Sequence, residues 1–275
     1  MTDERLARVA QGWDEAADGY EEYFVPRFAP WVRTAVDSLT SGSRTAQLSD
    51  GPILVPCCGT FPELELLVER FPARAIAGID LSAGMVRRAR ERAARLGSAD
   101  VEVVQGDAGT LDPRWSGACA AVVSVFGLQQ LPDPEAALRS WVDALAPGGR
   151  MCVVYWPGKT EDDGPFALLA KVIGDRSDSS WEDRLVGALD AGTVERDEFV
   201  DFPMTHPDAA TYFDAADRAG PMRALALARG DAYIAELRQR YVAAAPAGEW
   251  THHPRARLIL VRKPPSRAEA TPPTS

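Results

Sequence analysis

The feature that most restricts the fold is an alternation of short apolar runs with longer amphipathic stretches between residues 50 and 156. The amphipathic stretches carry apolar residues at intervals of three and four, which is typical of helices buried on one side. Apolar runs closed by Gly, Pro or Asp are typical of buried strands, here near residues 53–55, 75–79, 101–104, 120–125 and 150–155. This alternation, with its short connections, predicts a doubly wound α/β fold, a parallel sheet with helices on both faces.

Helix boundaries in this stretch are marked by residues with clear local preferences. Ser82 is placed to cap a helix whose apolar stripe runs from Met85 to Leu96. Pro134 suits a first helical turn, because the N–H that proline lacks would be unpaired there anyway. The run Pro147-Gly148-Gly149 is expected to end that helix and to turn into the fifth strand.

Outside the alternation the chain is mainly helical. Its N-terminal aromatic residues predict two or three short helices that end near Leu39 and are interrupted by Pro26 and Pro30. A sixth strand near 193–202 and a last strand near 256–261 complete a sheet of seven strands. The predicted division is an N-terminal helical lid at 1–45, an α/β core at 46–160, a helical cap at 161–250, the last core strand at 251–263 and a disordered tail at 264–275.

Composition and charge exclude several kinds of partner. The chain has 30 Lys and Arg against 40 Asp and Glu, and its net charge of −10 argues against nonspecific binding to nucleic acid or to an anionic membrane. The acidic N-terminus does not resemble a signal peptide, and no apolar run approaches the roughly 18 residues of a membrane span, so we expect a cytoplasmic protein. The four cysteines, at 57, 58, 119 and 152, fit neither a disulfide framework nor a zinc site, and no metal is expected.

Two acids follow strands at the edge where open parallel sheets bind ligands. Asp80 follows the second strand, 21 residues beyond Gly59, and Asp107 follows the third strand. An acid at the first position can accept hydrogen bonds from both ribose hydroxyls, and an acid at the second can accept one from the adenine amine. Either Asp alone is more simply explained as a helix N-cap. The two together, at this spacing, indicate a pocket for an adenosine group.

Five motifs, taken in order and spacing, resemble those of the class I S-adenosylmethionine-dependent methyltransferases that act on small molecules. They are ILVPCCGTFPE at 53–63, GIDLSAGMVRRAR at 78–90, VVQGDAGTLD at 103–112, VVSVFGLQQLPDP at 122–134 and LAPGGR at 145–150. The resemblance implies a Rossmann-like methyltransferase fold with a helical lid and a helical cap insertion. It also implies S-adenosylmethionine as cofactor and a small molecule as methyl acceptor.

The resemblance implies a cofactor site residue by residue. Asp80 would bind the ribose with Leu81 against the adenine, and Asp107 would bind the adenine amine with Ala108 packed on the base. Tyr20 stands where related enzymes have a lid tyrosine over the cofactor carboxylate. The other residues implied to contact the cofactor are Pro56, Cys57, Cys58, Gly59, Met85, Val125 and Gln130.

The glycine turn departs from the family pattern D-x-G-x-G-x-G. The aligned positions are Val55, Cys57, Gly59 and Phe61, so only the middle glycine is kept. Glycine serves in such turns because the backbone approaches the ligand closely or takes a positive φ. We expect the small Cys57 to be accommodated. At Phe61, either the loop bends differently or the side chain turns into the core.

The leading functional hypothesis is methyl transfer to O, N or C of a small, partly apolar metabolite, with secondary metabolism implied by the resemblance. His206 and Gln130 are the candidate catalytic residues, and for His206 a structural or capping role competes with that of general base. His252 and His253 are expected to be solvated in a polar turn. The candidate walls of the acceptor pocket are Tyr23, Trp156, Tyr212, Phe213, Met222 and Tyr233.

Two other functions compete with methyl transfer. A cofactor-binding protein of the same fold, acting as a scaffold or binder, is one alternative, because the altered glycine turn weakens the case for catalysis. A nicotinamide dehydrogenase fits poorly, because the first turn lacks the G-x-G-x-x-G of dinucleotide-binding folds. The sequence leaves the oligomeric state and the identity of the acceptor open.

Replacing Asp80 with Ala is expected to abolish binding of S-adenosylmethionine and S-adenosylhomocysteine, because the ribose hydroxyls lose their acceptor at a cost of roughly 1–3 kcal/mol or more. Isothermal titration calorimetry with both ligands and with NAD measures the effect. Unchanged affinity in the Asp80→Ala variant means that the pocket is misplaced. Tight binding of NAD alone overturns the choice of cofactor.

Overall fold

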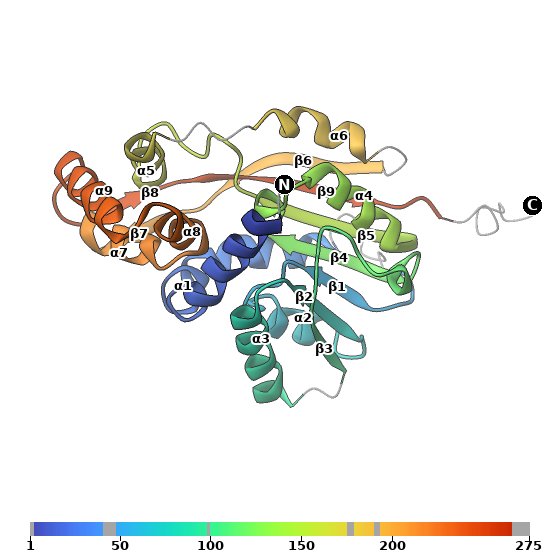
Figure 1. The fold of residues 1–275 in the computed structure, drawn as a ribbon. Helices are drawn as coiled ribbons and strands as arrows, with labels where there is room; N and C mark the ends of the chain where they lie inside the picture. The colour runs from blue at the N-terminus through green and yellow to red at the C-terminus, as the bar shows by residue number, and fades with distance from the viewer. Residues whose placement is uncertain (1–2, 41–47, 98–99, 175–178, 190–192, 266–275) are drawn as a thin grey trace, which may run out of the picture.

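The computed structural model describes residues 3–40, 48–97, 100–174, 179–189 and 193–265. Within these ranges a sheet of seven strands crosses the molecule in the order β3-β2-β1-β4-β5-β9-β6 (Figure 1). The strands are β1 (Ile53–Pro56), β2 (Ile76–Asp80), β3 (Val101–Gln105), β4 (Cys119–Val125), β5 (Leu145–Tyr155), β6 (Thr193–Asp201) and β9 (Arg255–Arg262). Each overlaps one of the strands predicted from the sequence, so the prediction of a seven-stranded sheet is confirmed.

The directions of the strands confirm a mostly parallel sheet. The strands from β3 to β5 pair in parallel. Strand β9 pairs antiparallel with both β5 and β6, so among the described strands of this sheet it alone runs against the others. The order of the strands reverses between β1 and β4, and such a reversal is where open α/β sheets bind their ligands.

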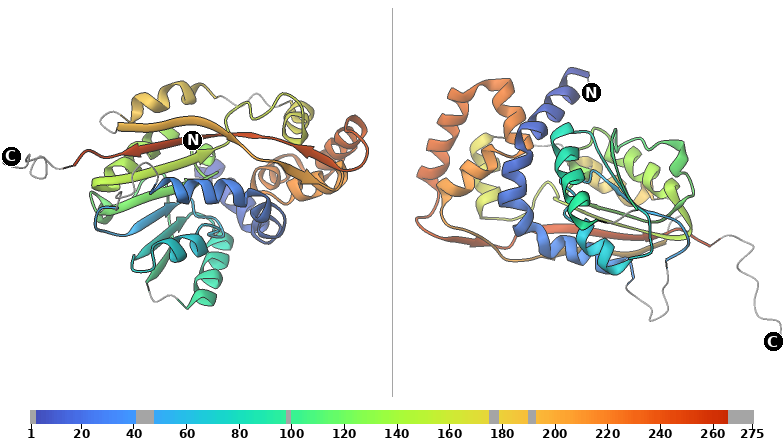
Figure 2. Two further views of the ribbon diagram at one scale, coloured as in Figure 1. Left: turned by 180° about the vertical axis from the view of Figure 1, so that it is seen from behind. Right: turned by 90° about the horizontal axis from the view of Figure 1, so that it is seen from below.

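Two hydrophobic cores lie on opposite faces of the sheet, because successive residues of a strand point to opposite sides. In β4, Ala121 and Val123 belong to one core and Val122 to the other. The helices beside the sheet are α1 (Asp3–Ser38), α2 (Leu64–Arg70), α3 (Ala83–Leu96) and α4 (Pro134–Ala144). The first core contains buried residues of α1, α2 and α3, and the second contains those of α4. Figure 2 shows the helices on the two sides of the sheet. Helices on both faces confirm the doubly wound architecture.

The helix boundaries follow the local signals closely. The Ser82 hydroxyl caps α3 by accepting a hydrogen bond from the Met85 amide at 3.1 Å, and Pro134 is the first residue of α4. The turn expected at Pro147-Gly148-Gly149 is instead part of β5, which begins directly after α4. The pairing of β4 with β5 is irregular between Cys119 and Ala121, and this irregularity takes up the extra residues.

The N-terminal segment is one helix, α1, and the prediction of two or three short helices is wrong. Pro26 and Pro30 lie inside it, and an interior proline costs a helix about 3 kcal/mol. The buried face continues across both prolines through Phe24, Phe28 and Trp31, which pack in the same core. This packing outweighs the local cost, so the chain bends and stays helical (Figure 2, right).

The cap contains a small second sheet that the sequence did not indicate. Strand β7 (Met204–His206) pairs antiparallel with β8 (Trp250–His252). His252 is therefore buried in a strand, and the prediction that it is solvated is wrong, whereas His253 is exposed. The remaining helices are α5 (Pro165–Ile173), α6 (Leu185–Ala188), α7 (Ala209–Asp217), α8 (Gly220–Arg229) and α9 (Asp231–Ala244), with 3₁₀ turns η1 (Pro113–Trp115), η2 (Leu128–Gln130) and η3 (Ser180–Arg184).

Two boundary questions follow from the described ranges. The end of the predicted lid at 41–45 and most of the predicted tail, from residue 266, lie outside the described residues. None of the helices within those ranges combines the length and the apolar character that a membrane span requires.

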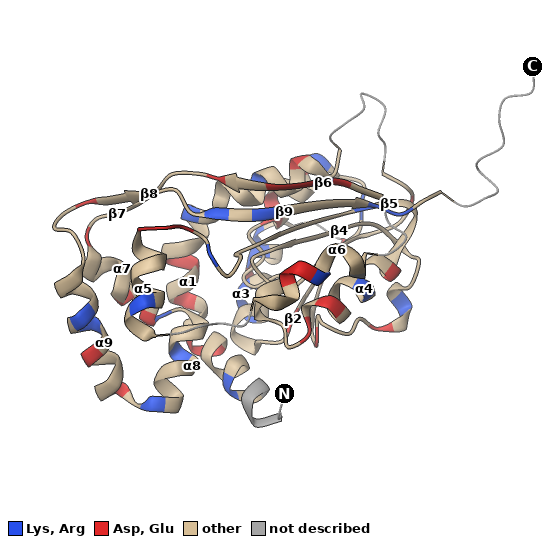
Figure 3. Ribbon diagram, turned by 90° about the horizontal axis from the view of Figure 1, so that it is seen from above, with Lys and Arg blue, Asp and Glu red and all other residues tan. Residues whose placement is uncertain are grey.

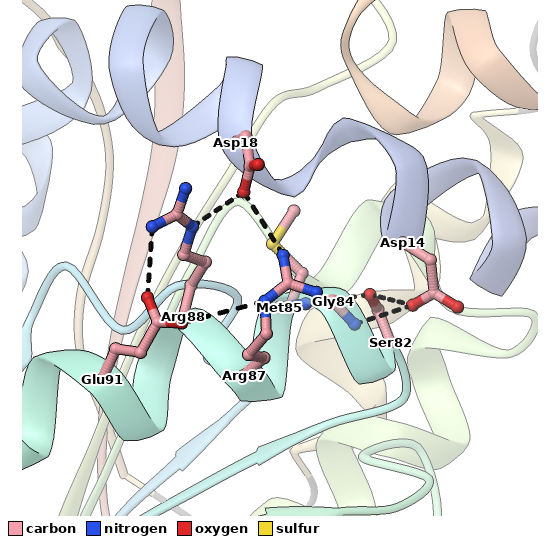
Figure 4. A network of polar contacts seen from close by, with 8 residues as sticks. All are labelled: Asp14, Asp18, Ser82, Gly84, Met85, Arg87, Arg88 and Glu91. Atoms are coloured by element: carbon pink, nitrogen blue, oxygen red, sulfur yellow. Dashed lines mark hydrogen bonds and ion pairs between the residues drawn. The ribbon is translucent and has the colours of Figure 1, made fainter.

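Helix α1 docks across the N-terminus of α3 through two acids (Figure 4). Asp14 Oδ1 accepts hydrogen bonds from Ser82 Oγ at 2.5 Å and from the Gly84 amide at 3.0 Å. One turn further along α1, Asp18 Oδ1 accepts one from Arg88 Nε at 2.7 Å. The absence of a side chain at Gly84 permits this approach, because a Cβ there would lie 2.6 Å from the Asp14 carbonyl oxygen.

The Asp14→Ala variant loses both hydrogen bonds that join α1 to the start of α3. We expect the free energy of unfolding to fall by about 1–2 kcal/mol, and we expect faster amide exchange in the first half of α1. Urea unfolding and hydrogen exchange measure the two effects. Asp18→Ala is the matched control, because the Asp18 side chain is 64% exposed and exposed ion pairs contribute only about 0–1 kcal/mol. Equal effects of the two variants contradict this account.

Candidate functional site

A pocket opens at the carboxyl ends of β1 to β4, where the strand order reverses. Helix α1 covers it with Val9, Ala10, Trp13 and Tyr20. The structure brings together all of the residues implied to bind the cofactor except Pro56. Those that line the pocket are Tyr20, Cys57, Cys58, Gly59, Asp80, Leu81, Met85, Asp107, Ala108, Val125 and Gln130.

The loop after β1 keeps the geometry of a glycine turn without most of its glycines. Cys57, Gly59 and Phe61 all have positive φ angles, of 56°, 55° and 67°. Such a left-handed conformation costs a residue with a side chain roughly 1–2 kcal/mol, so the two substituted positions are strained. Pro56 is buried behind the loop, where its carbonyl accepts a hydrogen bond from Ser124 Oγ at 2.9 Å.

The Phe61 side chain turns into the core, which is one of the two outcomes expected from the sequence. It is fully buried and packs against β2 at Gly78. A Cβ at position 78 would lie 2.7 Å from Phe61 Cε1 and 2.9 Å from Cys58 Sγ. The missing side chain on β2 therefore makes room for the extra ring in the loop, and burial of the ring offsets the backbone strain.

Asp80 is held in place by the backbone on both sides of it. Its Oδ2 accepts a hydrogen bond from the Gly59 amide at 2.8 Å, and its Oδ1 accepts one from the Ser82 amide at 2.9 Å. Burial raises the pKa of this carboxyl, and the two amides act against that rise by stabilising the charged form. Each oxygen keeps a further lone pair, so the carboxylate can still accept from a ligand.

Asp107 lies at the end of β3, beside Asp80 on the neighbouring strand. Its Oδ1 accepts a hydrogen bond from the Gly109 amide at 2.8 Å, while the side chain is exposed at the pocket mouth. Ala108 is buried, and its carbonyl accepts from Trp141 Nε1 at 2.7 Å. The loop after β3 is thus anchored to α4, and it directs Asp107 and Ala108 to the same pocket as Asp80.

A second cavity adjoins the first. Trp13, Tyr20, Phe126 and Gln130 line both of them. The second cavity is mainly aromatic, and the Phe126 and Trp156 rings in its wall stack at 4.1 Å. Further walls are Phe24, Phe28, Phe166, Leu169, Tyr212 and Met222. Of the predicted acceptor walls, Trp156, Tyr212 and Met222 lie here, and Tyr23, Phe213 and Tyr233 are not among the lining residues.

The two glutamines after β4 both face this aromatic cavity. Gln129 Nε2 donates a hydrogen bond to the Phe126 carbonyl at 2.7 Å, and Gln129 Oε1 is buried without a protein partner. Gln130 lies at the junction of the two cavities. Leaving a buried acceptor unpaired is costly, so the unpaired Gln129 Oε1 among the residues that line this cavity is a feature that the protein contacts do not explain.

His206 belongs to a buried chain of hydrogen bonds. The Tyr23 hydroxyl lies 2.8 Å from His206 Nδ1, His206 Nε2 lies 3.0 Å from His252 Nε2, and His252 Nδ1 lies 2.6 Å from Glu161 Oε2. His206 lines neither of the two cavities described above, and both of its ring nitrogens are engaged. Burial lowers the pKa of His206 to about 3, and the neighbouring His252 adds to the effect.

This series of hydrogen bonds connects α1 to the small sheet of the cap, because Tyr23 lies on α1, His206 on β7 and His252 on β8. Glu161 extends it to α5, where its Oε1 accepts from the Phe166 amide at 2.7 Å. The arrangement supports the structural role of His206 that competed with general base catalysis. Among the described residues, no three His, Cys, Asp or Glu side chains are grouped closely enough to hold a metal ion.

The residues of the site that sequence reasoning missed include Trp13, Glu63 and Phe126. Trp13 comes from α1, and no pattern in the sequence shows which face of that helix covers the pocket. Phe126 has a positive φ of 61° directly after β4, which the sequence does not reveal. Glu63 stands within the first family-like motif, and an acid beside an apolar loop was the available signal.

A family model described as a methyltransferase domain matches residues 53–149, from β1 into β5. Together with the seven-stranded sheet, this match confirms the resemblance drawn from the five motifs. Over these residues the chain matches a methyltransferase domain, and its motifs there resemble those of the class I S-adenosylmethionine-dependent enzymes.

Curated relatives agree with this match, and a solved structure agrees with the fold. Trans-aconitate 2-methyltransferase of Streptomyces coelicolor is 32% identical over 133 residues, which are 48% of this chain and 42% of the relative. Demethylmenaquinone methyltransferase of Thermus thermophilus is 34% identical over 148 residues, 53% of this chain and 62% of the relative. The chain spans about half the length of the curated relatives it matches. The solved [4+2]-cyclase SpnF shares the fold with a TM-score of 0.54 at 22% identity, over 86% of this chain and 82% of its own.

The buried His206 predicts that acid destabilises the protein. Its pKa is about 3 in the folded chain and near the ordinary 6.5 in the unfolded chain, so the unfolded state binds more protons between these values. The free energy of unfolding therefore falls as pH drops from 6.5 toward 3, by up to about 1.4 kcal/mol per pH unit from this group. Urea unfolding of the wild type and of His206→Gln at several pH values checks this. Equal pH slopes for the two proteins contradict the prediction.

Proposed function

We propose that this protein transfers a methyl group from S-adenosylmethionine to O, N or C of a small, largely apolar acceptor. One observation carries the proposal: a cavity lined by acids at the strand ends meets a cavity walled by aromatic rings. Methyl transfer is an in-line displacement, in which the donor and the acceptor must meet end to end with water excluded. Two adjoining cavities of different chemistry suit that requirement.

The first cavity suits a positively charged nucleoside. Among the described residues that line it, Glu63, Asp80 and Asp107 are acids and none is Lys or Arg. Asp80 and Asp107 end neighbouring strands, so in the proposal one binds the ribose hydroxyls and the other the adenine amine of the same molecule. When bound, S-adenosylmethionine supplies the methyl group on a sulfonium, whose positive charge the acids attract.

The chain itself contributes positioning and desolvation. Trp13, Tyr20 and Phe126 stand at the junction of the cavities, where their ring faces can attract a cation and keep water away. Gln130 stands at the same junction and can hydrogen-bond to either ligand. We assign no proton transfer to His206, because both of its ring nitrogens are engaged and it lies outside both cavities.

The second cavity indicates the chemistry of the acceptor. Its aromatic walls favour a planar or otherwise apolar molecule. The unpartnered Gln129 Oε1 favours an acceptor that carries a hydroxyl or an N–H group, because that donor would satisfy the buried oxygen. A small secondary metabolite with one such donor on an apolar body fits the proposal.

A cofactor-binding protein without methyl transfer is the competing function. The solved [4+2]-cyclase has the same fold, and a [4+2] cyclisation is a reaction other than methyl transfer. Function depends on the site and not on the fold alone, so the reaction must be tested directly.

The deciding experiment has two stages. Calorimetry with S-adenosylmethionine, S-adenosylhomocysteine and NAD tests the cofactor, and we expect binding of the first two only. Production of S-adenosylhomocysteine is then followed over a panel of apolar phenols, amines and enols, with Asp80→Ala as the inactive control. Binding of the cofactor with no turnover on any acceptor favours the scaffold.

Phe166 tests the proposed acceptor cavity, because it lines the aromatic cavity and not the acidic one. In Phe166→Ala we expect the KM for the acceptor to rise about tenfold, because one buried ring contact is lost. The Kd for S-adenosylmethionine should stay unchanged. Steady-state kinetics and calorimetry measure both quantities. Phe199→Ala is the matched control, because Phe199 is 57% exposed on β6, away from both cavities. Weaker binding of S-adenosylmethionine together with an unchanged KM for the acceptor contradicts the assignment of the two cavities.

A further inference from the structure

A buried acid in the first cavity, Glu63, carries a side-chain oxygen that no described residue pairs with. Glu63 precedes α2 and is only 2% exposed, yet its Oε2 has no hydrogen-bond partner. It lines the same cavity as Asp80 and Tyr20. A buried carboxyl oxygen without a partner is costly, so a site that keeps one is a site prepared for a ligand group.

The cation that acts on the Glu63 carboxyl, Arg92, is paired with other groups. The Arg92 side chain donates to the Thr60 carbonyl at 3.0 Å and forms ion pairs with Glu21 and Glu65. It lowers the pKa of Glu63 only as a secondary influence, and no ion pair between the two is formed. Glu63 therefore faces the cavity without a counter-ion of its own.

Glu63 lies at the end of the cavity opposite Asp107. The strand order at this edge of the sheet is β3-β2-β1. Asp107 follows β3, Asp80 ends β2, and Glu63 comes at the end of the loop after β1. Asp80 is therefore between the other two acids, so a nucleoside held by Asp80 and Asp107 extends its 5′ substituent toward Glu63.

We propose that the Glu63 carboxylate binds the α-ammonium group of the amino-acid part of S-adenosylmethionine. This inference rests on the proposed function, because it assumes an adenosyl ligand held by Asp80 and Asp107. The geometry supplies what an ammonium needs, a carboxylate oxygen in a water-poor site with no competing partner. Tyr20, beside it, remains for the adjacent carboxylate of the ligand.

The proposal implies that binding of the cofactor releases a proton. Burial raises the pKa of Glu63 to about 8, with its own backbone amide and Arg92 acting against the rise, so near neutral pH the free protein holds this carboxyl largely protonated. A bound ammonium stabilises the ionised form and lowers the pKa, so the proton leaves to solvent. The titratable or charged groups around Glu63 are Tyr20 on α1, Cys58 in the loop, Glu65 on α2, Asp80 on β2 and Arg92 on α3.

The test compares two ligands that differ in the amino-acid part. S-Adenosylhomocysteine carries the ammonium, and 5′-methylthioadenosine has the same nucleoside and sulfur without it. In Glu63→Gln we expect the Kd of S-adenosylhomocysteine to rise by about tenfold or more, the loss of one charged hydrogen bond, while the Kd of 5′-methylthioadenosine stays unchanged. Asp80→Ala should raise the Kd of both ligands, because both carry the nucleoside. The two variants together therefore distinguish contacts to the nucleoside from contacts to the amino-acid part.

Calorimetry in buffers of different ionisation enthalpy gives a second readout. Near pH 7 the wild type should release close to one proton on binding S-adenosylhomocysteine, and Glu63→Gln should release none. Glu69→Gln is the matched control, because Glu69 is an exposed acid on α2 and does not line the cavity. It should keep wild-type affinity and proton release.

The outcomes separate this inference from the proposed function. Unchanged affinity of Glu63→Gln for S-adenosylhomocysteine, or the absence of proton release in the wild type, overturns the role of Glu63 and leaves the adenosyl site standing. If Glu63→Gln loses binding of both ligands, the role of Glu63 is also overturned, because the residue would then support the whole pocket. A wild-type protein that binds neither ligand overturns the proposed function itself.

Discussion

The rest of the site depends on the hydrogen bonds that hold the Asp80 carboxylate in place. It accepts one hydrogen bond from the Gly59 amide and one from the Ser82 amide, so it joins the loop after β1 to the start of α3. Ser82 in turn donates its hydroxyl to Asp14, which brings α1 over the pocket. The loop after β1, α3 and α1 are thus arranged around one half-buried acid.

The loop beside Asp80 shows how a fold can keep a backbone conformation while losing the residues that make it easy. Cys57 and Phe61 adopt the positive φ angles that glycine takes without strain. Burial of the Phe61 ring against Gly78 offsets that cost within the same structure. The departure from the family pattern therefore leaves the path of the loop intact. The function then depends on the acids and aromatic rings around the turn.

The sequence predicted the parts of the site that lie on strand ends, and it did so for a physical reason. In a parallel sheet the carboxyl ends of strands meet at one edge, so Asp80 and Asp107 could be placed together from their positions after two strands. His206 and His252 could not be placed in this way, because they meet through a small sheet between segments that are far apart in the chain. Trp13 and Glu63 were missed because burial and the absence of a partner are properties of the packed molecule.

The sequence by itself determined the seven strands, the doubly wound core and the acids at its edge, since these follow from apolar periodicity and from strand ends that local patterns reveal. Only the tertiary structure decided that α1 continues through Pro26 and Pro30, that Phe61 turns into the core, and that an acidic cavity opens into an aromatic one. These outcomes depend on contacts between distant segments, whose packing energy outweighs local preference and cannot be read from neighbours along the chain.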